Sequence, residues 1–342
     1  MTGPAPQDPP GLDLARLGDW FAAEVPGAAR LSTARLVTGG KSNLTYEVGD
    51  GRSAWIVRRP PLGHVLSTAH DMAREYRVMS ALRATDVPVP ATYALCPDAG
   101  VLGAPFYVME RVAGTAYRHA AELEPLGPER TRDISTRLVD TLATLHAVDP
   151  AAVGLADFGR PDGFLGRQVR RWRKQLDASR SRDLPAADEL YARLASAVPA
   201  DSAPGIVHGD YRLDNVLVDD RDRLAGVIDW EMATLGDPLT DLALLVLYQR
   251  LGRLVGTAVA EASSAPGFLT EDEILGRYAT ASGRDLPSLG FHLGLAAFKL
   301  AAILEGIHFR HLRGQTVGAG FAQLGEVTEL LLDAGLTYLK EH

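Results

Sequence analysis

Hydrophobic and polar residues follow two different periods along the chain, and the change of period divides it into two parts. Between Arg35 and Met109, short runs of aliphatic and aromatic residues are separated by turn-forming residues, which predicts β-strands, with one helix expected before them and one among them. After Pro128, apolar residues recur every three or four positions, as in amphipathic helices. The pattern predicts an α+β protein. The expected strands cover residues 35–46 (broken by a Gly-Gly turn), 53–59, 91–95 and 106–109, and the expected helices cover 12–25, 69–83, 130–146, 164–176 and most of 271–342.

One later stretch, from Ile206 to Asp229, interrupts the helical pattern. Two aliphatic runs, 215–218 and 224–228, flank a polar turn, and this arrangement predicts a β-hairpin. Asp210, Asn215 and Asp229 stand at its edges, five and fourteen residues apart in turn. In kinases, a catalytic-loop Asp, an Asn five residues later and an Asp after the next strand form the phosphoryl-transfer site.

The chemistry of phosphoryl transfer calls for these residue types. A carboxylate that faces the acceptor hydroxyl takes its proton, which is the role predicted for Asp210. Mg²⁺ prefers oxygen ligands, and Asn215 and Asp229 would supply an amide and a carboxylate oxygen. The alternative is that these residues only favour turns. Asp229 argues against it, because it follows an apolar run and precedes Trp230, where an unpaired carboxylate is rare.

These residues carry a family resemblance. The segments HGDYRLDNVLVD and GVIDWEMATLGDPLTDLA resemble the aminoglycoside phosphotransferase-like (choline kinase-like) small-molecule kinase superfamily, and in particular the kinase-like domain fused to some acyl-CoA dehydrogenases. The resemblance implies a protein-kinase-like two-lobe fold and a reaction that uses ATP and Mg²⁺. It implies a small antiparallel-sheet N-lobe at 12–110 and a larger, mostly helical C-lobe at 111–342 with its catalytic loop at 206–231. Residues 1–11 are expected to be a disordered lead-in because of their proline-rich composition.

The resemblance also assigns the nucleotide-binding residues. The phosphate loop would lie near 38–43, where glycines let backbone N–H groups approach anionic oxygens and two side chains add donors. The hinge between the lobes would be 110–114, with backbone groups facing the adenine. A plain hairpin turn and an ordinary strand exit are the alternatives. The cofactor-binding residues expected are Gly39, Gly40, Ser42, Asn43, Glu110 and Val112.

A cation on the third strand and an acidic residue on the following helix complete the expected nucleotide site. Arg58 and Arg59 stand where protein kinases have a lysine, and alternation places them on opposite faces of the sheet. The match to the family strand favours Arg58 as the phosphate-binding cation, oriented by Glu75. Two solvated arginines and a surface glutamate are the alternative. The departure from lysine also leaves open a catalytically idle nucleotide-binding module.

Further residues are expected to support the loop or to bind the acceptor. The resemblance gives His208 and Asp241 structural roles near Asp210. In the last third, Lys299, His308 and Arg310 belong to a basic cluster in which positions 299 and 310 share one helical face. The cluster suits an anionic acceptor, such as a hydroxylated acid or its coenzyme A thioester. An aminoglycoside, being cationic, would call for acidic walls and is the second candidate. The alternative is that these basic residues form a solvated helix face and bind no acceptor.

Composition narrows the possible partners and surroundings. The formal net charge of −8 argues against a nucleic-acid-binding surface. The one cysteine, Cys96, allows no intrachain disulfide, which fits a reducing cytoplasm. We expect no apolar run to reach the length of a membrane span, since Lys299 breaks the richest one, 296–303. The expected partners are therefore a nucleotide and a small-molecule acceptor. The protein is expected to be a monomer or a homodimer. The sequence does not decide whether the nucleotide is ATP or GTP.

Overall fold

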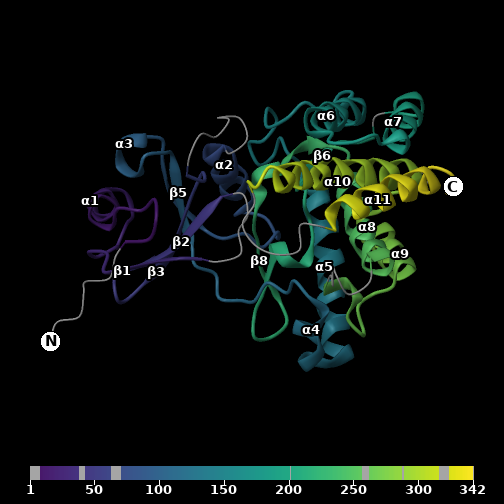
Figure 1. Ribbon diagram of the computed structural model, residues 1–342. Coiled ribbons are helices and arrows are strands. Elements are labelled where there is room, and N and C mark those ends of the chain that lie inside the picture. Colours follow the sequence, from purple (N-terminus) through teal and green to yellow (C-terminus); the bar gives the residue numbers. More distant parts are fainter. Residues whose placement is uncertain are drawn as a thin grey trace. The chain divides into compact units, whose positions relative to one another are not determined.

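The computed structural model describes residues 8–37, 43–62, 71–200, 202–255, 262–286, 289–315 and 323–341. The chain forms two compact units, which Figure 1 colours along the sequence. The first consists of Met1–Gly114 and Ala225–Ala233, and the second of Thr115–Leu224 and Thr234–His342. A sheet-containing first unit and a mostly helical second unit agree with the predicted fold class.

An antiparallel sheet of five strands, in the order β1-β2-β3-β5-β4, forms the centre of the first unit. Its helices begin where aspartates cap them: the side chains of Asp13 and Asp71 accept hydrogen bonds from backbone N–H groups of the first turn. The strands are β1 (Thr33–Leu36), β2 (Leu44–Gly49), β3 (Ala54–Arg59), β4 (Thr92–Cys96) and β5 (Phe106–Glu110), and the helices are α1 (Leu14–Glu24), α2 (Met72–Leu82) and α3 (Ala99–Leu102).

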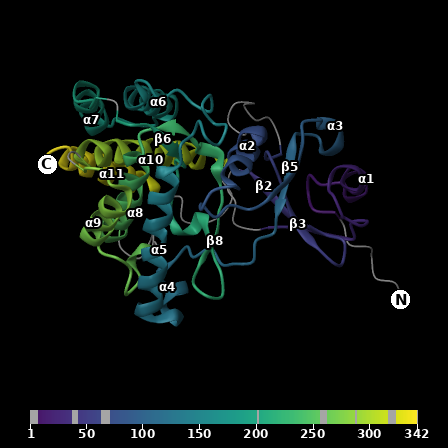
Figure 2. The ribbon, with the colours of Figure 1, turned by 180° about the vertical axis from the view of Figure 1, so that it is seen from behind.

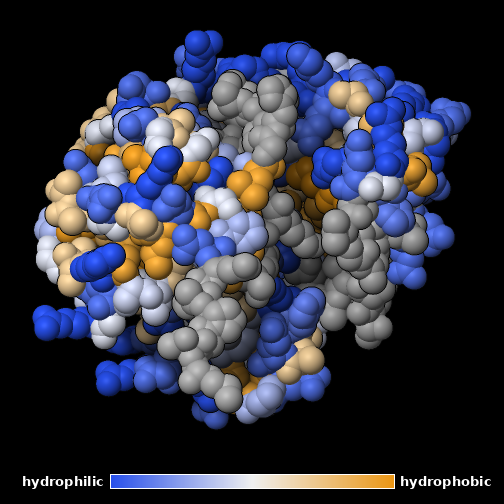
Figure 3. Space-filling model, turned by 60° about the vertical axis from the view of Figure 1, so that its left-hand side comes forward, coloured by the Kyte–Doolittle hydropathy of each residue, from blue (hydrophilic) through white to orange (hydrophobic). Residues whose placement is uncertain are grey.

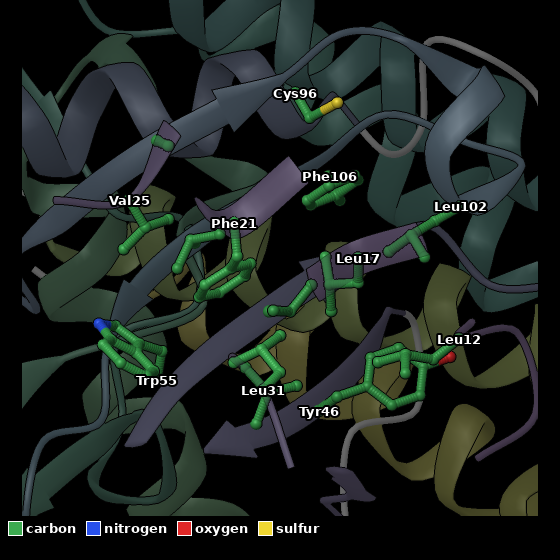
Figure 4. Close-up of a cluster of buried hydrophobic side chains, with 14 residues drawn as sticks. Leu12, Leu17, Phe21, Val25, Leu31, Tyr46, Trp55, Cys96, Leu102 and Phe106 are labelled. Atoms are coloured by element: carbon green, nitrogen blue, oxygen red, sulfur yellow. The ribbon is translucent and has the colours of Figure 1, made fainter. Parts of the chain in front are cut away.

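The hydrophobic core of this unit lies between one face of the sheet and α1. Alternate residues of β2, β3 and β5 meet Leu17 and Phe21 of the helix (Figure 4). The rings of Phe21 and Trp55 pack edge to face with centroids 5.6 Å apart. Because Trp55 and Val57 point to this face, the alternation of β3 sends Arg58 to the opposite face, where α2 packs.

The prediction that residues 1–11 are disordered is wrong for residues 8–11, while 1–7 lie outside the described residues. Tyr46 donates its hydroxyl hydrogen to the Pro10 carbonyl at 2.6 Å, and Arg59 Nη1 donates to the Gly11 carbonyl at 2.6 Å. Arg59 also donates to the carbonyl of Leu102. Proline-rich composition suggested disorder, but two buried donors from the sheet bind this segment through its carbonyl groups.

The boundaries of the two units differ from the predicted lobes. The first unit continues to Gly114 instead of ending at residue 110, and it includes Ala225–Ala233, which we assigned to the C-lobe. Hydrogen bonds explain the second difference: Val227 N–H donates to the Pro88 carbonyl at 2.7 Å, and Arg74 Nη2 donates to the Ala233 carbonyl at 3.2 Å.

Helices make up most of the second unit. The long helix α10 packs against α6, α8 and α11, and α10 and α11 lie side by side in both Figure 1 and Figure 2. The helices are α4 (Ala120–Leu123), α5 (Gly127–Ala147), α6 (Phe164–Ser179), α7 (Pro185–Ser196), α8 (Leu239–Val255), α9 (Glu271–Ser282), α10 (Leu289–Leu312) and α11 (Leu324–Tyr338), with 3₁₀ turns at Glu124–Leu126, Leu213–Asn215 and Ala262–Ser264, and in the first unit at Trp230–Met232.

Short strands frame the stretch that the sequence singled out. β6 (Gly205–Val207) pairs antiparallel with β9 (Thr234–Gly236) within the second unit. β7 (Val216–Val218) and β8 (Leu224–Val227) are the strands of the predicted hairpin, and the division between the units falls after Leu224, the first residue of β8.

Helix α10 corrects the expectation that no segment is long and apolar enough to cross a membrane. By length and composition Leu289–Leu312 would suffice, with a mean hydropathy of 1.4 over its most apolar window. The protein buries 72% of that window, and this burial accounts for the apolar composition. On the face of the molecule shown in Figure 3, hydrophilic residues predominate and apolar ones form scattered groups.

Candidate active site

The loop that follows β6 carries Asp210 and is held by α8. Asp241, a buried residue of α8, accepts hydrogen bonds from the backbone N–H groups of His208 at 2.6 Å and Gly209 at 2.8 Å. Gly209 has a φ of +88°, which only glycine adopts without strain. His208 is fully buried, and its Nδ1 accepts from the Asp210 N–H at 3.2 Å. His208 and Asp241 thus lie where structural support was expected, and they shape the turn that presents Asp210.

The side chain of Asp210 is held by two donors, one on each oxygen. Asn215 Nδ2 donates to Oδ2 at 3.1 Å and to the Asp210 backbone carbonyl at 2.8 Å. The hydroxyl of Tyr248, on α8, donates to Oδ1 at 3.0 Å. Both hydrogens of the Asn215 amide are therefore used, and its oxygen accepts no hydrogen bond from the described residues. This orientation suits the metal-binding role predicted for Asn215.

In the first unit, Arg58 is surrounded by carboxylates. Its Nε lies 3.0 Å from Glu75 Oε2, and its Nη2 lies 2.5 Å from Asp229 Oδ1 and 3.9 Å from Glu231 Oε2. The predicted pairing of Arg58 with Glu75 is present as an ion pair. The Nε–H group of Arg58 is not aligned to make a hydrogen bond with the Glu75 carboxylate. Between the two candidate arginines, Arg58 is thus the one that faces Asp229.

Glu75 is the most deeply buried of these carboxylates, and its protonation responds to that burial. Tyr107 donates its hydroxyl hydrogen to Oε2 at 3.0 Å. Burial raises the pKa of Glu75 to about 7, although the nearby Arg58 lowers it. Burial disfavours the charge of Arg58 too, but Glu75 and Asp229 outweigh this effect and raise the Arg58 pKa. Arg58 stays charged, while Glu75 is able to change its protonation near neutral pH.

Asn43 departs from its predicted role as a phosphate donor. Its Nδ2 donates to Glu75 Oε1 at 3.2 Å and to Glu231 Oε2 at 2.9 Å. An amide nitrogen carries two hydrogens, so these two carboxylates leave none for a phosphate oxygen in this structure. Asn43 instead connects the two carboxylates beside Arg58, a long-range contact that its position next to the glycine turn did not reveal.

Asp229 combines a charged side chain with an unusual backbone. Its φ of +67° lies in the left-handed region, which costs a non-glycine residue roughly 1 kcal/mol or more. The buried ring of Trp230 donates from Nε1 to the Val227 carbonyl at 2.9 Å and fixes the turn. Asp229 Oδ2 accepts no hydrogen bond from the described residues. Three carboxylates around one arginine leave an excess of negative charge, which suits a divalent cation.

Comparison with known proteins identifies the chain. Residues 33–292 match the profile of the Phosphotransferase enzyme family. The chain belongs to this family. The enzyme class and the family resemblance that the Asp210, Asn215 and Asp229 spacing suggested are thereby confirmed. Asp210 and Asn215 belong to the second unit and Asp229 to the first, so the joint action of the three on one metal ion stays a prediction.

Two relatives of the phosphotransferase differ in how much of their own length this chain covers. Acyl-CoA dehydrogenase family member 11 of Gallus gallus is 34% identical over 335 residues, which cover 96% of this chain but only 42% of that protein. A solved structure from Ralstonia eutropha JMP134, provisionally named an aminoglycoside phosphotransferase, is 32% identical with a TM-score of 0.84, covering 96% of this chain and 98% of that one. The chain thus spans less than half of the curated relative and almost all of the solved one.

More distant structures confirm the fold. The aminoglycoside phosphotransferase APH(4)-Ia, solved in a ternary complex with ADP and hygromycin B, is 15% identical with a TM-score of 0.62, covering 95% of this chain and 98% of that one. The predicted protein-kinase-like two-lobe class, with an antiparallel sheet in one unit and helices in the other, agrees with these neighbours.

The remaining nucleotide-binding residues of the phosphotransferase are only partly described. Gly39, Gly40 and Ser42 lie outside the described residues. Glu110 ends β5, where its own N–H donates to the Ala91 carbonyl at 2.7 Å and its carboxylate accepts from the Ala91 N–H at 3.1 Å. No described residue accepts from the Val112 N–H, which leaves this donor available at the predicted hinge.

The predicted basic cluster on α10 does not form one site. Lys299 Nζ donates to the Gly209 carbonyl, next to Asp210, and lies 5.6 Å from the centroid of the Trp172 ring. His308 lies beside Gly325 of α11, and Arg310 is exposed. Lys299 and Arg310 are eleven residues apart, about 16 Å along the helix axis. Of the three predicted residues, Lys299 is therefore the one at the Asp210 loop. Helical spacing predicts which residues share a face of a helix, but it does not predict that they lie close together along the helix axis.

Two contacts of this site were not predicted from the sequence, those of Tyr248 and Glu231. Tyr248 follows Asp241 by seven residues, a spacing that places both on one face of a helix and could have revealed it. Glu231 was seen only as part of the motif after Asp229, and its bond to Asn43 joins residues 188 positions apart. No local pattern announces a contact of that range.

Proposed function

We propose that this phosphotransferase moves the γ-phosphate of ATP, bound with Mg²⁺, to a hydroxyl group of an anionic small molecule. The observation that carries the proposal is the hydrogen-bonded pair of Asp210 and Asn215. The hydrogen bonds hold the Asp210 carboxylate in a fixed plane, as proton removal requires. They leave the Asn215 oxygen without a donor, as metal binding requires.

The chemistry follows from the roles of these groups. Asp210 would accept the proton of the acceptor hydroxyl as that oxygen bonds to the γ-phosphorus, while the bond from phosphorus to the bridging oxygen of ADP breaks. Asn215 Oδ1 and Asp229 Oδ2 would hold Mg²⁺, which neutralises phosphate charge when bound. Arg58 would keep Asp229 in place, and Glu75 would keep Arg58 in place.

The cations beside Asp210 support an anionic acceptor. Among the described residues no carboxylate forms an ion pair with Lys299 or with Arg171, whose guanidinium lies 5.1 Å from the centroid of the same Trp172 ring. Two cations on one ring attract a carboxylate or phosphate and repel an aminoglycoside. The name of the curated relative, an acyl-CoA dehydrogenase, is also consistent with an acyl compound. We propose a hydroxyacyl acid or its coenzyme A thioester.

A coupled assay for ADP release tests the acceptor class. Hydroxyacyl acids of several chain lengths and hydroxyl positions, their coenzyme A thioesters, kanamycin and hygromycin B would be offered with Mg-ATP, with Asp210→Asn as the blank. The proposal expects turnover with at least one hydroxyacyl compound and none with the antibiotics. Turnover with an antibiotic and with no hydroxyacyl compound would assign the protein to antibiotic phosphorylation instead.

One observation favours a second candidate, a nucleotide-binding module without catalysis. Arg58 occupies the strand position of the protein-kinase lysine, and it holds Asp229 Oδ1 at 2.5 Å. A thermal-shift scan separates the candidates, because a ligand that binds the native state raises its unfolding temperature. The idle module predicts a shift with Mg-ATP and no turnover with any acceptor, whereas the absence of both would contradict the two candidates together.

A further inference from the structure

Helix α8 contacts the Asp210 loop at two points two helical turns apart. Asp241, in its first turn, accepts from the backbone N–H groups of His208 and Gly209. Tyr248, seven residues later, donates to the carboxylate of Asp210. Residues seven apart lie on one face of a helix, about 10 Å apart along its axis. One rigid helix thus fixes both the backbone before Asp210 and the side chain of Asp210.

The Tyr248 ring is itself held in place. It is 8% exposed, and the guanidinium of Arg212 lies 4.2 Å from its centroid. Arg212 is in turn paired with Asp214 of the same loop. A buried phenol between a helix and a stacked cation has little rotational freedom, so its hydroxyl offers a donor at a fixed position.

The charges around Asp210 make a fixed donor useful. Lys299 of α10 and Asp214 and Arg212 of the loop all lie near it. These charges pull the carboxylate in different directions, and neither Lys299 nor Arg212 is aligned on its oxygens by a hydrogen bond among those described. Asn215 on Oδ2 and Tyr248 on Oδ1 are the groups that set its plane.

We propose that Tyr248 is a positioning residue for phosphate transfer, whose hydroxyl aligns the Asp210 carboxylate toward the acceptor hydroxyl. The inference rests on the proposed role of Asp210. A carboxylate turned away from the acceptor still carries its charge, but the reacting atoms leave the geometry in which proton transfer accompanies attack. Tyr248 therefore acts on the rate of the chemical step and not on the binding of nucleotide.

The test replaces only the hydroxyl, with Tyr248→Phe. This variant keeps the ring and its contact with Arg212. We expect kcat to fall about tenfold, with KM for Mg-ATP within twofold of wild type. Tyr338→Phe is the matched control, since Tyr338 is a buried tyrosine with the Arg250 guanidinium 4.4 Å from its ring centroid.

A second measurement does not depend on turnover. In protein labelled with carboxyl-¹³C aspartate, the Asp210 signal is assigned by its loss in Asp210→Asn. The proposal expects this signal to move in Tyr248→Phe and to stay in Tyr338→Phe. If wild type phosphorylates no acceptor, the proposed function fails and the carbon signal alone decides whether Tyr248 holds Asp210. An unmoved signal, or a kcat equal to that of Tyr338→Phe, would overturn the inference.

Discussion

Arg58 and Asp229 share a hydrogen bond of 2.5 Å between Nη2 and Oδ1, although 171 residues separate them in the chain. The bond joins β3 to the segment that follows β8, and both belong to the first unit. It takes one oxygen of Asp229 and leaves the other without a donor among the described residues. An arginine that holds a carboxylate in this way fixes the direction of the remaining lone pairs.

The first prediction concerns metal binding by Asp229. Asp229→Asn keeps the size of the side chain and tolerates a positive φ, but it removes the charge. We expect affinity for Mg-ATP to fall at least tenfold, or about 1.4 kcal/mol, measured by titration calorimetry. Asp222→Asn is the control, because Asp222 also has a positive φ but lies in the turn between β7 and β8, before Asp229. Equal affinities of the two variants for Mg-ATP would remove Asp229 from the metal site.

The second prediction separates proton removal from nucleotide binding. Asp210→Asn retains an oxygen for the Tyr248 hydroxyl but cannot act as a base. We expect kcat to fall by about 10²–10⁴-fold, the usual contribution of general-base catalysis, while calorimetry shows Mg-ATP affinity within a few-fold of wild type. Turnover within a few-fold of wild type would show that another group removes the proton or that none needs to.

The third prediction is a pH dependence of stability that arises from Glu75. Its pKa of about 7 exceeds the usual 4.5, so between these values the folded protein binds a proton that the unfolded chain releases. The stabilising contribution is complete below pH 4.5 and is lost as pH rises through 7, by about 3 kcal/mol in all. Urea unfolding across this range should show a steeper decline for wild type than for Glu75→Gln.

Other titrating groups cancel in that comparison because both proteins contain them. Glu24→Gln, which changes an exposed glutamate at the end of α1, controls for the loss of one carboxyl group. Its stability, measured at each pH, is the baseline with which the Glu75→Gln curve is compared. Parallel curves for wild type and Glu75→Gln would mean that Glu75 titrates alike in the folded and unfolded chains.

Sequence patterns predicted the elements of this fold better than the contacts between them. The helix expected at 69–83 is α2, Met72–Leu82, and the expected hairpin is β7 and β8. Periodicity reports which residues share a face of an element, so it placed Arg58 and Arg59 on opposite faces, and the match to the family strand then favoured Arg58. It does not report distance along a helix, and for this reason Arg310 was grouped with Lys299 although only Lys299 lies at the Asp210 loop.

Contacts between distant residues were the second gap. Asn43 was expected to face phosphate because of its neighbours in sequence, but its amide joins Glu75 and Glu231. The segment Ala225–Ala233 follows a C-lobe strand in sequence, yet its backbone bonds to Pro88 and Arg74 place it in the first unit. Such contacts depend on which elements pack together, and one sequence alone carries little information about that packing.

The last prediction tests whether Lys299 recognises the charge of the acceptor. Lys299→Met keeps the unbranched stem and removes the ammonium group beside Asp210. With an anionic hydroxyacyl acceptor, we expect KM for the acceptor to rise about tenfold while KM for Mg-ATP stays within twofold, because a lost ion pair costs on the order of 1–2 kcal/mol. Arg310→Met removes a cation from the exposed end of the same helix and should leave both constants unchanged. Both variants remove one positive charge, but from different places on α10. An equal rise in acceptor KM would therefore mean that acceptor binding responds to the net charge of the second unit and not to a specific contact with Lys299. An unchanged acceptor KM in Lys299→Met would assign Lys299 to the Gly209 carbonyl alone, and the anionic acceptor would then need another cation.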